Sequence, residues 1–462
     1  MTLKLFNTQG RTLGEFRPIK KGEVGLYSCG PTVYWYQHIG NLRTYIFNDI
    51  LKRVLTYDGF KVKHVMNVTD VGHLTSDADE GEDKMEKAAA KEGKKAEDIA
   101  NFYLSVFRED FKKLNITEPT VWCKATEHIK EQIELIQKLE KKGFTYKTED
   151  GIYFDTSKFE DYGKLALLNI EGLESGKRID AGEKKNKTDF ALWKFSNKDE
   201  KRQQEWKSPW GTGFPGWHIE CSAMSSKYLG EQFDIHTGGE DHIPVHHTNE
   251  IAQSECAFGK KPWVKYWLHG AFLTFKGDKI SKSKGGLYTI SELEKLGYEP
   301  LAYRYLCLLT HYRKPLDFSL ESLDAARTAY DRLKAKIIDM KKDEFSRKTP
   351  TEFKQQFMRA IDEDLNMPKA IGILWDVLND DLLGNKQKLE LCYDFDKVFG
   401  LGLKDVKEEK VDVPKEVKEL VDKRNEAKKK KDFALADKLR NEIKAKGYGL
   451  LDSKEGTKVK KI

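Results

Sequence analysis

The apolar pattern of the chain changes sharply between residues 24 and 55. Val24, Leu26 and Ser28 alternate with their neighbours in the manner of a short β-strand. After a Gly30-Pro31 break, apolar residues recur at helical spacing. These positions are Leu42, Tyr45, Ile46, Ile50, Leu51, Val54 and Leu55. The pattern predicts a strand followed by a buried helix.

The tetrapeptide His38-Ile39-Gly40-Asn41 lies at this strand-to-helix junction. Unpaired backbone N–H groups and the positive end of the helix dipole suit a phosphate-bearing ligand there. Gly40 has no side chain, so a base or phosphate could approach the backbone closely. By itself the tetrapeptide is weak evidence, since a histidine at a helix start is usually a cap or a packing residue.

A second strand is predicted at Lys61–Val68 and ends at Thr69-Asp70. Strand, helix and strand in this order indicate a parallel α/β unit, whose ligands bind beyond the carboxyl ends of the strands. Cys29, Thr69 and Asp70 lie there. The polar stretch His73–Asp98 has little apolar periodicity, so we expect a loop or charged helix over the site rather than core.

The middle of the chain is expected to hold an insertion and a second half of the α/β domain. Short β-like pieces with charged loops between them make Gly143–Gly213 an insertion. These pieces are Phe144–Lys147, Gly151–Asp155 and Phe190–Phe195. The second half is predicted as a helix over Gly216–Leu229, a strand at Phe233–His236, a helix carrying His246 to Ile251, and a strand at Trp267–Phe275.

Beyond Ser291 the pattern predicts helices throughout. The expected segments are Leu301–Leu309, Leu323–Met340, Phe353–Asp364, Ala370–Leu378 and Leu389–Phe399. Pro414 marks a boundary, after which Val417–Lys446 is predicted as two short amphipathic helices before a lysine-rich tail.

Composition narrows the class of protein. The 462 residues are 39% hydrophobic, contain no apolar run of membrane-spanning length, and begin with MTLKLFN, which is not typical of a signal peptide. Six cysteines without paired spacing argue against a disulfide framework. We therefore expect a soluble, cytoplasmic protein without a membrane partner. The net charge is +6, and lysines are concentrated near the C-terminal end of the sequence. Such a lysine-rich segment fits either a polyanionic partner or a solvated helix face.

A second candidate site is the loop Lys279-Ile280-Ser281-Lys282-Ser283, which has glycines on both sides. Two lysines three residues apart can neutralise charge that develops on a triphosphate, and the glycines would let the loop close over it. A lone motif of this kind is more often an exposed basic turn. Its pairing with the junction at residues 38–41 favours a nucleotide site.

HIGN at residues 38–41 and KISKS at 279–283 resemble the two signatures of class I aminoacyl-tRNA synthetases. Further blocks resemble the cysteinyl-tRNA synthetase family across essentially the whole chain. They are YSCGPTVY (27–34), PGWHIECSAM (215–224), HHTNEIAQSE (246–255) and HYRKPLDFS (311–319). The resemblance implies a Rossmann-type, doubly wound parallel-sheet catalytic domain with an insertion, a helical bundle and a small basic C-terminal module. The expected division is 1–120, 121–213, 214–290, 291–405 and 406–462.

A metal site can be argued from the residues themselves. His246 and Glu250 are four apart on a predicted helix and so project from one face. Cys221 at a helix start and Cys29 at a strand end could add two thiolates, which makes a plausible zinc set. In isolation, such cysteines are more often core residues and such a His–Glu pair a surface pair. The resemblance implies that these four residues hold one zinc ion, with His247 as the alternative histidine.

The resemblance also implies the reaction and its participants. ATP, with Mg²⁺, and L-cysteine form cysteinyl-adenylate, and the terminal ribose hydroxyl of tRNA(Cys) then takes the cysteine. Zinc would bind the substrate thiolate, which separates cysteine from serine without an editing domain. ATP is assigned to His38, Gly40, Asn41, Gly238, Gly239 and Lys282. The catalytic residues are His38, Asn41, Lys279 and Lys282. Cysteine is assigned to Gly30, Thr32, Thr69, Trp217 and Asp241.

The chain departs from the family pattern at several positions. Asn41 replaces the second histidine of HIGH, Ile280 replaces the methionine of KMSKS, the role of His73 is open, and the tail lacks a tryptophan. Three rivals are a ligase that transfers cysteine to an amino-sugar, a nucleotidyltransferase and an inactive RNA-binding paralogue. The helical region and basic module favour tRNA as the acceptor. We expect a monomer.

Overall fold

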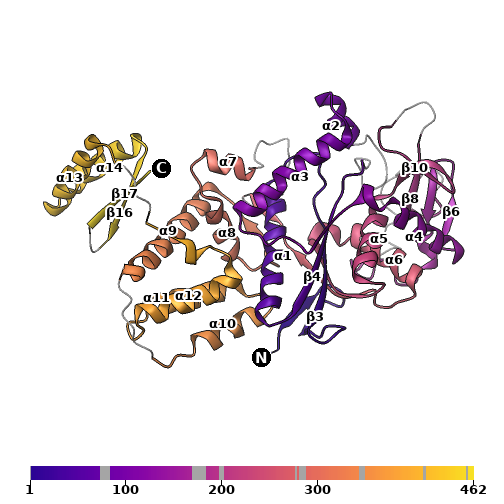
Figure 1. Ribbon diagram of the computed structural model, residues 1–462, viewed down its shortest axis with the longest axis horizontal. Helices are drawn as coiled ribbons and strands as arrows, with labels where there is room; N and C mark the ends of the chain where they lie inside the picture. Colours follow the sequence, from indigo (N-terminus) through magenta and orange to yellow (C-terminus); the bar gives the residue numbers. More distant parts are fainter. Residues whose placement is uncertain are drawn as a thin grey trace. The chain divides into compact units, whose positions relative to one another are not determined.

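The computed structural model describes residues 2–72, 84–168, 184–196, 202–275, 278–279, 288–342, 349–408, 413–453 and 456–461 (Figure 1). The chain forms two compact units, Met1–Lys404 and Asp405–Ile462. Among the helices of these described residues, none combines the length and the apolar character that crossing a lipid bilayer requires.

A five-stranded sheet of parallel strands is the centre of the first unit. Its order is β12 (Val264–Gly270), β11 (Phe233–Gly239), β3 (Glu23–Ser28), β4 (Lys61–Val68) and β5 (Val121–Lys124). Numbered along the chain as five strands, this is the 3-2-1-4-5 order of a Rossmann-type sheet read from its other edge. The fold class expected from the sequence is therefore confirmed. The order reverses between β3 and β11, and ligands of such sheets bind beyond the carboxyl ends of the strands at that point.

Helices alternate with the strands of this sheet along the chain. Helix α1 (Ile39–Tyr57) joins β3 to β4, whereas α5 (Trp217–Leu229) leads into β11 and α6 (His246–Phe258) leads out of it. The apolar positions predicted for α1 are buried, as expected for a helix that packs on a parallel sheet. A small hairpin of β1 (Lys4–Asn7) and β2 (Thr12–Glu15) precedes them.

The predicted insertion is an antiparallel sheet. Its order is β6 (Thr145–Lys147), β7 (Gly151–Phe154), β8 (Phe190–Phe195), β10 (Gly211–Pro215) and β9 (Trp206–Ser208). Trp193 and Phe154 of this sheet share a hydrophobic core with Ile136 of α4 (Ile129–Lys141) and Ile219 of α5. The expected division places the start of the insertion at residue 121. Residue 121 is the first residue of β5, which pairs with β4 and so belongs to the parallel sheet rather than to the insertion.

The sequence predicts that the stretch His73–Asp98 is a loop or charged helix rather than core. Its described part does contain a charged helix, but the expectation that it lies outside the core is wrong. Residues 84–98 contribute α2 (Lys84–Glu92) and the start of α3 (Ala96–Lys113). Met85 and Ala89 are buried with Val33 and Ile99 in one cluster. Two apolar residues four apart are enough to dock a short charged helix, but they are too few to stand out as a periodic pattern. His73 lies outside the described residues.

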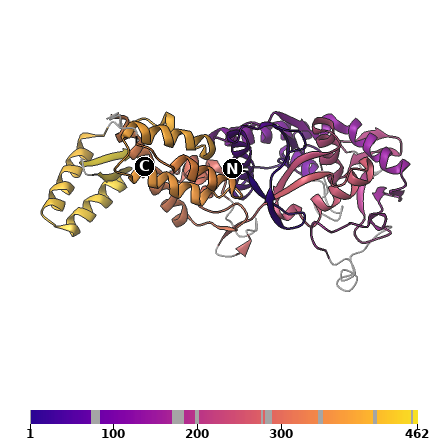
Figure 2. The same cartoon turned by 90° about the horizontal axis from the view of Figure 1, so that it is seen from below.

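The segment after β12 forms a small sheet and then a helical region. The strand expected at Trp267–Phe275 is two strands, since β12 ends at Gly270 and β13 (Leu273–Phe275) pairs with β14 (Asp278–Lys279) and β15 (Leu316–Asp317). The helices are α7 (Ile290–Lys295), α8 (Pro300–Leu308), α9 (Leu320–Lys342), α10 (Phe353–Asp362), α11 (Met367–Asn379) and α12 (Asn385–Phe399). Helices α8 to α12 and the antiparallel insertion lie on opposite sides of the parallel sheet (Figure 2).

The second unit contains α13 (Lys415–Lys429) and α14 (Phe433–Ala445), as the sequence predicts, but its end is not a tail. Strands β16 (Tyr448–Ser453) and β17 (Gly456–Lys461) form an antiparallel hairpin. Leu450 of this hairpin packs with Val417, Val421 and Ile443 of the two helices. The lysines hide the strand pattern in the sequence, because only alternate residues of such a hairpin need to be apolar.

Two carboxyl groups meet where α1 ends, and they make stability dependent on pH. Asp58 follows α1, and Asp362 is the last residue of α10, almost completely buried. Burial, together with the neighbouring Asp362 carboxyl, raises the pKa of Asp58 to about 7, and burial also raises the pKa of Asp362. An acid with a raised pKa in the folded chain favours folding below its unfolded pKa, and this advantage is lost as the pH rises through 7.

We therefore expect Asp58→Asn to stabilise the chain by about 1 to 2 kcal/mol at pH 8 and to have no such effect near pH 4. Thermal unfolding at the two pH values measures this difference. Asp376→Asn, at an exposed aspartate on α11, is the control and should change neither value. An equal gain at both pH values for Asp58→Asn would show that repulsion between the two carboxyl groups is not the cause.

Candidate active site and metal centre

His38 and Asn41 meet at the start of α1. His38 is the N-cap of the helix, and its Nδ1 accepts a hydrogen bond from the backbone N–H of Asn41 at 3.3 Å. The backbone N–H of His38 donates to Oδ1 of Asn41 at 3.3 Å, which completes a capping box. Gly40 lies between them in the first turn. The two side chains predicted to contact ATP phosphates are thus held against each other at the positive end of the helix dipole.

The carboxyl ends of the central strands gather several of the predicted cysteine contacts. Thr32 pairs with Thr69 as an isolated parallel bridge, and the backbone N–H of Gly30 donates to Oδ1 of Asn67 at 2.7 Å. A Cβ on Gly30 would lie 1.7 Å from the carbonyl oxygen of Asn67, so this close approach requires glycine. The hydroxyl of Thr69 donates to Oε2 of Glu220 at 3.1 Å. Glu220, fully buried on α5, was not predicted from the sequence.

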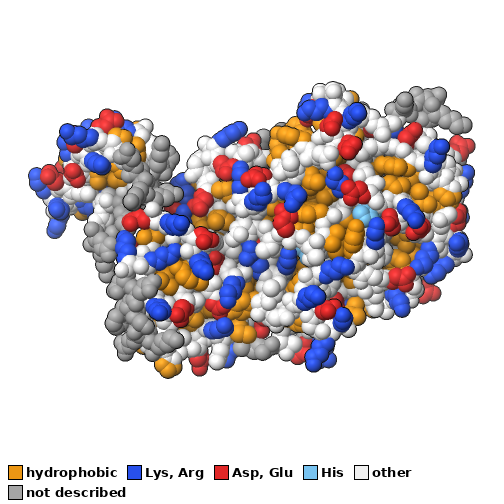
Figure 3. All heavy atoms as spheres, in the orientation of Figure 1, with side chains coloured by type: hydrophobic (Ala, Val, Ile, Leu, Met, Phe, Trp, Pro, Cys, Tyr) orange, Lys and Arg blue, Asp and Glu red, His pale blue; other side chains and the backbone are white. Residues whose placement is uncertain are grey.

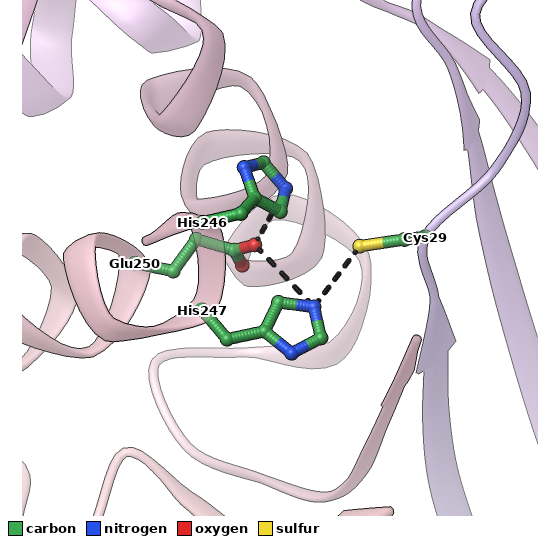
Figure 4. Close-up of side chains that lie close together, drawn as sticks. All are labelled: Cys29, His246, His247 and Glu250. Carbon is green, nitrogen blue, oxygen red and sulfur yellow. Dashed lines mark hydrogen bonds and ion pairs between the residues drawn. The ribbon is translucent and has the colours of Figure 1, made fainter. Parts of the chain in front are cut away.

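Four buried side chains meet beside this edge and could bind a metal ion (Figure 4). They are Cys29, His246, His247 and Glu250, whose ligand atoms all lie within 4.8 Å of one another. Nε2 of His246 is 2.9 Å and Nε2 of His247 is 4.0 Å from Oε1 of Glu250, and Sγ of Cys29 is 3.3 Å from Nε2 of His247. Oε1 of Glu250 is buried and makes no hydrogen bond to any described residue. A buried carboxylate oxygen that lies among imidazole nitrogens and a sulfur atom, with ion pairs but no hydrogen bond to them, fits a divalent cation such as zinc.

The fourth predicted ligand, Cys221, lies next to this group. Its Sγ is 3.6 Å from Nε2 of His246. Trp217, one turn earlier on α5, stacks on the ring of His246 with 4.1 Å between ring centroids and 22° between planes. The structure therefore brings Cys29, Cys221, His246 and Glu250 together, and adds His247 as a fifth candidate.

Further histidines surround these five residues, and sequence reasoning missed them. Nε2 of His236 is 2.9 Å from Oε2 of Glu250, and Nδ1 of His218 is 2.9 Å from Nδ1 of His246. Nδ1 of His247 is 2.7 Å from Nε2 of His269, which in turn contacts the Thr8 hydroxyl. Such partners fix the orientation of metal-binding side chains. Their only signal in the sequence was a histidine at a strand end or a helix start.

The charges within the group favour a cation. Burial alone would raise the pKa of Glu250, but His236 and His246 outweigh it and lower this pKa to about 2. Burial would likewise lower the pKa of His246, but the charge of Glu250 and the hydrogen bond with Cys221 raise it to about 10. The hydrogen bond with Cys29 lowers the pKa of Cys221, whereas burial raises that of Cys29. The site thus favours a carboxylate and one thiolate balanced by the positive charge of His246, and a cation that replaced this proton would meet the same two negative side chains.

The glycines predicted for ATP adjoin the same centre. Gly238 and Gly239 end β11, and a Cβ on Gly238 would lie 2.6 Å from Cε1 of His247. A Cβ on Gly239 would lie 2.3 Å from Oδ1 of Asp241, which places this carboxylate against the glycine backbone. The backbone of Lys279 belongs to β14, and Lys282 lies outside the described residues.

The chain is similar to a known family, to curated relatives and to a solved structure. Residues 15–328 match the family model for the tRNA synthetases class I (C) catalytic domain. A cysteine–tRNA ligase 1 of Burkholderia lata is 51% identical over 99% of this chain and 97% of its own, and a cysteine–tRNA ligase of Treponema denticola is 44% identical over 100% of both. A crystal structure of Mycobacterium tuberculosis methionyl-tRNA synthetase bound by methionyl-adenylate has a TM-score of 0.56 at 13% identity, and the match covers 82% of this chain and 90% of that one. At that identity the likeness concerns the fold alone.

Proposed function

The chain belongs to the cysteine–tRNA ligases among the class I tRNA synthetases, and from this premise we propose that its buried cysteine, histidine and glutamate side chains hold a zinc ion that selects the amino acid. The observation that carries the proposal is that the sulfur of Cys29, the ring nitrogen of His246 and the carboxylate of Glu250 meet in one buried group, with Cys221 beside them. The ion supplies a site for the sulfur of the substrate, which binds as a thiolate.

The selection has a chemical reason. Serine has the shape of cysteine, and a hydrophobic pocket separates such isosteres poorly. A thiolate is a much better zinc ligand than a hydroxyl group. Trp217, stacked on His246, would close one side of the pocket, while Gly30, Thr32, Thr69 and Asp241 would contact the polar groups of the amino acid. The buried Glu220 supports this arrangement by accepting the hydrogen bond of Thr69.

The other predicted residues would serve the activation of cysteine by ATP and its transfer to the tRNA. His38 and Asn41 would bind the phosphates of ATP at the helix dipole, with Gly238 and Gly239 against the adenosine. Lys279 and Lys282, together with Mg²⁺, would stabilise the charge that develops as the carboxylate of cysteine displaces pyrophosphate. No protein nucleophile is required, since the substrate carboxylate and then the ribose hydroxyl of tRNA(Cys) attack. The helices of residues 291–405 and the basic module of residues 406–462 would bind the tRNA.

ATP–pyrophosphate exchange, measured with cysteine and with serine on protein assayed for zinc, tests this proposal. We expect about one zinc ion per chain and exchange with cysteine alone. Exchange that survives complete removal of zinc, or that proceeds equally with serine, would contradict the proposed role of the metal.

The choice between Cys221 and His247 as the fourth zinc ligand gives a sharper prediction. If the ligands are Cys29, Cys221, His246 and Glu250, Cys221→Ser should lower the zinc content at least about tenfold under dialysis, and His247→Asn should lower it much less. His247 would then orient the centre through its contact with His269. Metal analysis of both variants beside the parent decides the point. The reverse order of zinc loss would assign His247, and not Cys221, as the ligand.

A further inference from the structure

An aromatic cluster stands open at the surface beside the start of α1. Trp35, Tyr36 and Phe102 are 43%, 40% and 44% exposed, although tryptophan and phenylalanine rings are normally buried. In the described part of the chain only one further large aromatic side chain, Phe433, is as exposed. Three open rings in one place are therefore unusual for this molecule. Nothing in the activation of cysteine uses them.

The cluster is held by a buried ring at its centre. Tyr103 is buried, and its ring lies 5.8 Å from Trp35, 5.0 Å from Tyr36 and 5.1 Å from Phe102, measured between centroids. The hydroxyl of Tyr103 donates to Glu92 at 3.1 Å. Tyr36 meets Trp35, Phe102 and Tyr103 at 79° to 89° between ring planes, so these contacts are edge to face rather than stacked. Edge-to-face packing of this kind holds the rings in place and leaves their faces uncovered by one another.

Two lysine ammonium groups lie near the open rings, one of them, Lys94, in an ion pair with Glu92 at 3.0 Å. Nζ of Lys91 lies 5.6 Å from the centroid of Trp35, and Nζ of Lys94 lies 5.6 Å from the centroid of Phe102. The segment from Met85 to Lys95 contains four lysines and two glutamates. In the space-filling view, hydrophobic side chains reach the surface beside α2 and α3 with Lys and Arg side chains near them (Figure 3). Exposed rings with ammonium groups close by are the combination that binds unpaired nucleotides, because bases stack on the rings and phosphates pair with the lysines.

The cluster also lies at the reaction site. Tyr36 is two residues before His38, the N-cap of α1, and Val33 of the same loop donates its N–H to the carbonyl of Thr69 at the carboxyl edge of the sheet. The acceptor of the cysteine must bring its 3′ end to this edge. We propose that Trp35, Tyr36 and Phe102, with Lys91 and Lys94, form a stacking surface for the unpaired 3′ nucleotides of the tRNA. This inference rests on the proposed function and adds to it the surface that receives the end of the acceptor.

Binding of intact tRNA(Cys) and of the same tRNA without its unpaired 3′ nucleotides tests the surface. The parent enzyme should bind the shortened tRNA at least about fivefold more weakly, as expected from the loss of one or more stacked bases. The variant Trp35→Ala/Phe102→Ala should bind intact tRNA as weakly as the parent binds the shortened one, and it should no longer distinguish the two. Trp35→Tyr/Phe102→Tyr keeps the rings and should behave as the parent does. Leu13→Ala, at an exposed side chain on β2, is the matched control and should also match the parent.

Three results would overturn the inference. The alanine variant could lose as much affinity on shortening of the tRNA as the parent does, or it could bind intact tRNA as tightly as the parent. The third result is that the parent sediments as a dimer and the alanine variant as a monomer that still binds tRNA. In that case the cluster is a contact between two copies of the chain. Charging of tRNA by the parent is measured first. Failure of that reaction is a failure of the proposed function and is thus distinguished from failure of the surface alone.

Discussion

Glu250→Gln is expected to lower cysteine-dependent ATP–pyrophosphate exchange at least about a hundredfold and to lower the zinc content of the purified protein. The substitution keeps the size of the side chain and a group that can still bond to His236. It removes the negative charge that the histidines stabilise, and with it the charged oxygen that lies 2.9 Å from Nε2 of His246. A neutral amide is a far poorer zinc ligand than a carboxylate, so both the metal and the activation of cysteine should be lost.

Glu255→Gln on the same helix is the matched control. Glu255 accepts the backbone N–H of Trp263 at 3.1 Å, a bond that glutamine can also accept, and it does not belong to the metal group. The control should therefore keep both zinc and exchange. Treatment of the parent with a chelator should reproduce the effect of Glu250→Gln, and added Zn²⁺ should reverse it. A Glu250→Gln enzyme with a full complement of zinc and normal exchange would remove Glu250 from the ligand set.

The sequence predicts the elements of the fold best where one face of a regular element is buried. The spacing of apolar residues gives α1, and the predicted strand at 61–68 coincides with β4. Periodicity fails for α2, which docks mainly through Met85 and Ala89. It also fails for the hairpin of β16 and β17, where lysines mask the alternation. In each failure the burial comes from a partner distant in sequence, which periodicity does not record.

For the candidate metal site, too, the sequence predicts some of the contacts and not others. Sequence reasoning brings Cys29, His246 and Glu250 together, because strand ends meet at one edge of a parallel sheet and residues four apart share a helix face. The closeness of His247 to Cys29 depends on a side-chain direction, which no spacing rule gives. The open ring of Phe102 is a comparable case, since helical spacing groups it with Tyr103 as an apolar residue but does not say which of the two is buried.

Arg304→Met is expected to destabilise the first compact unit by about 3 to 5 kcal/mol, the usual cost of breaking a buried ion pair from one side. Arg304 is fully buried on α8, and its guanidinium donates to Oδ2 of Asp49 at 2.6 Å and to the carbonyl of Phe399 at 2.6 Å. Burial raises the pKa of Asp49, but Arg304 and Arg53 outweigh it and lower this pKa to about 2. Removal of the arginine leaves a buried carboxylate with one cation fewer and carbonyl groups without a donor.

A double-mutant cycle isolates the contribution of this ion pair, with midpoints of urea unfolding as the measurement. Asp49→Asn should recover part of the stability in the Arg304→Met background, although it destabilises the parent, because it removes the charge that the first change leaves unpaired. The stabilisation by Asp49 should be full above its unfolded pKa near 4 and should fall as the pH approaches 2. Arg327→Met, at a partly exposed ion pair on α9, should cost less than about 1 kcal/mol. If the free-energy changes of Arg304→Met and Asp49→Asn are additive, packing and not charge stabilises the contact between α8 and α1.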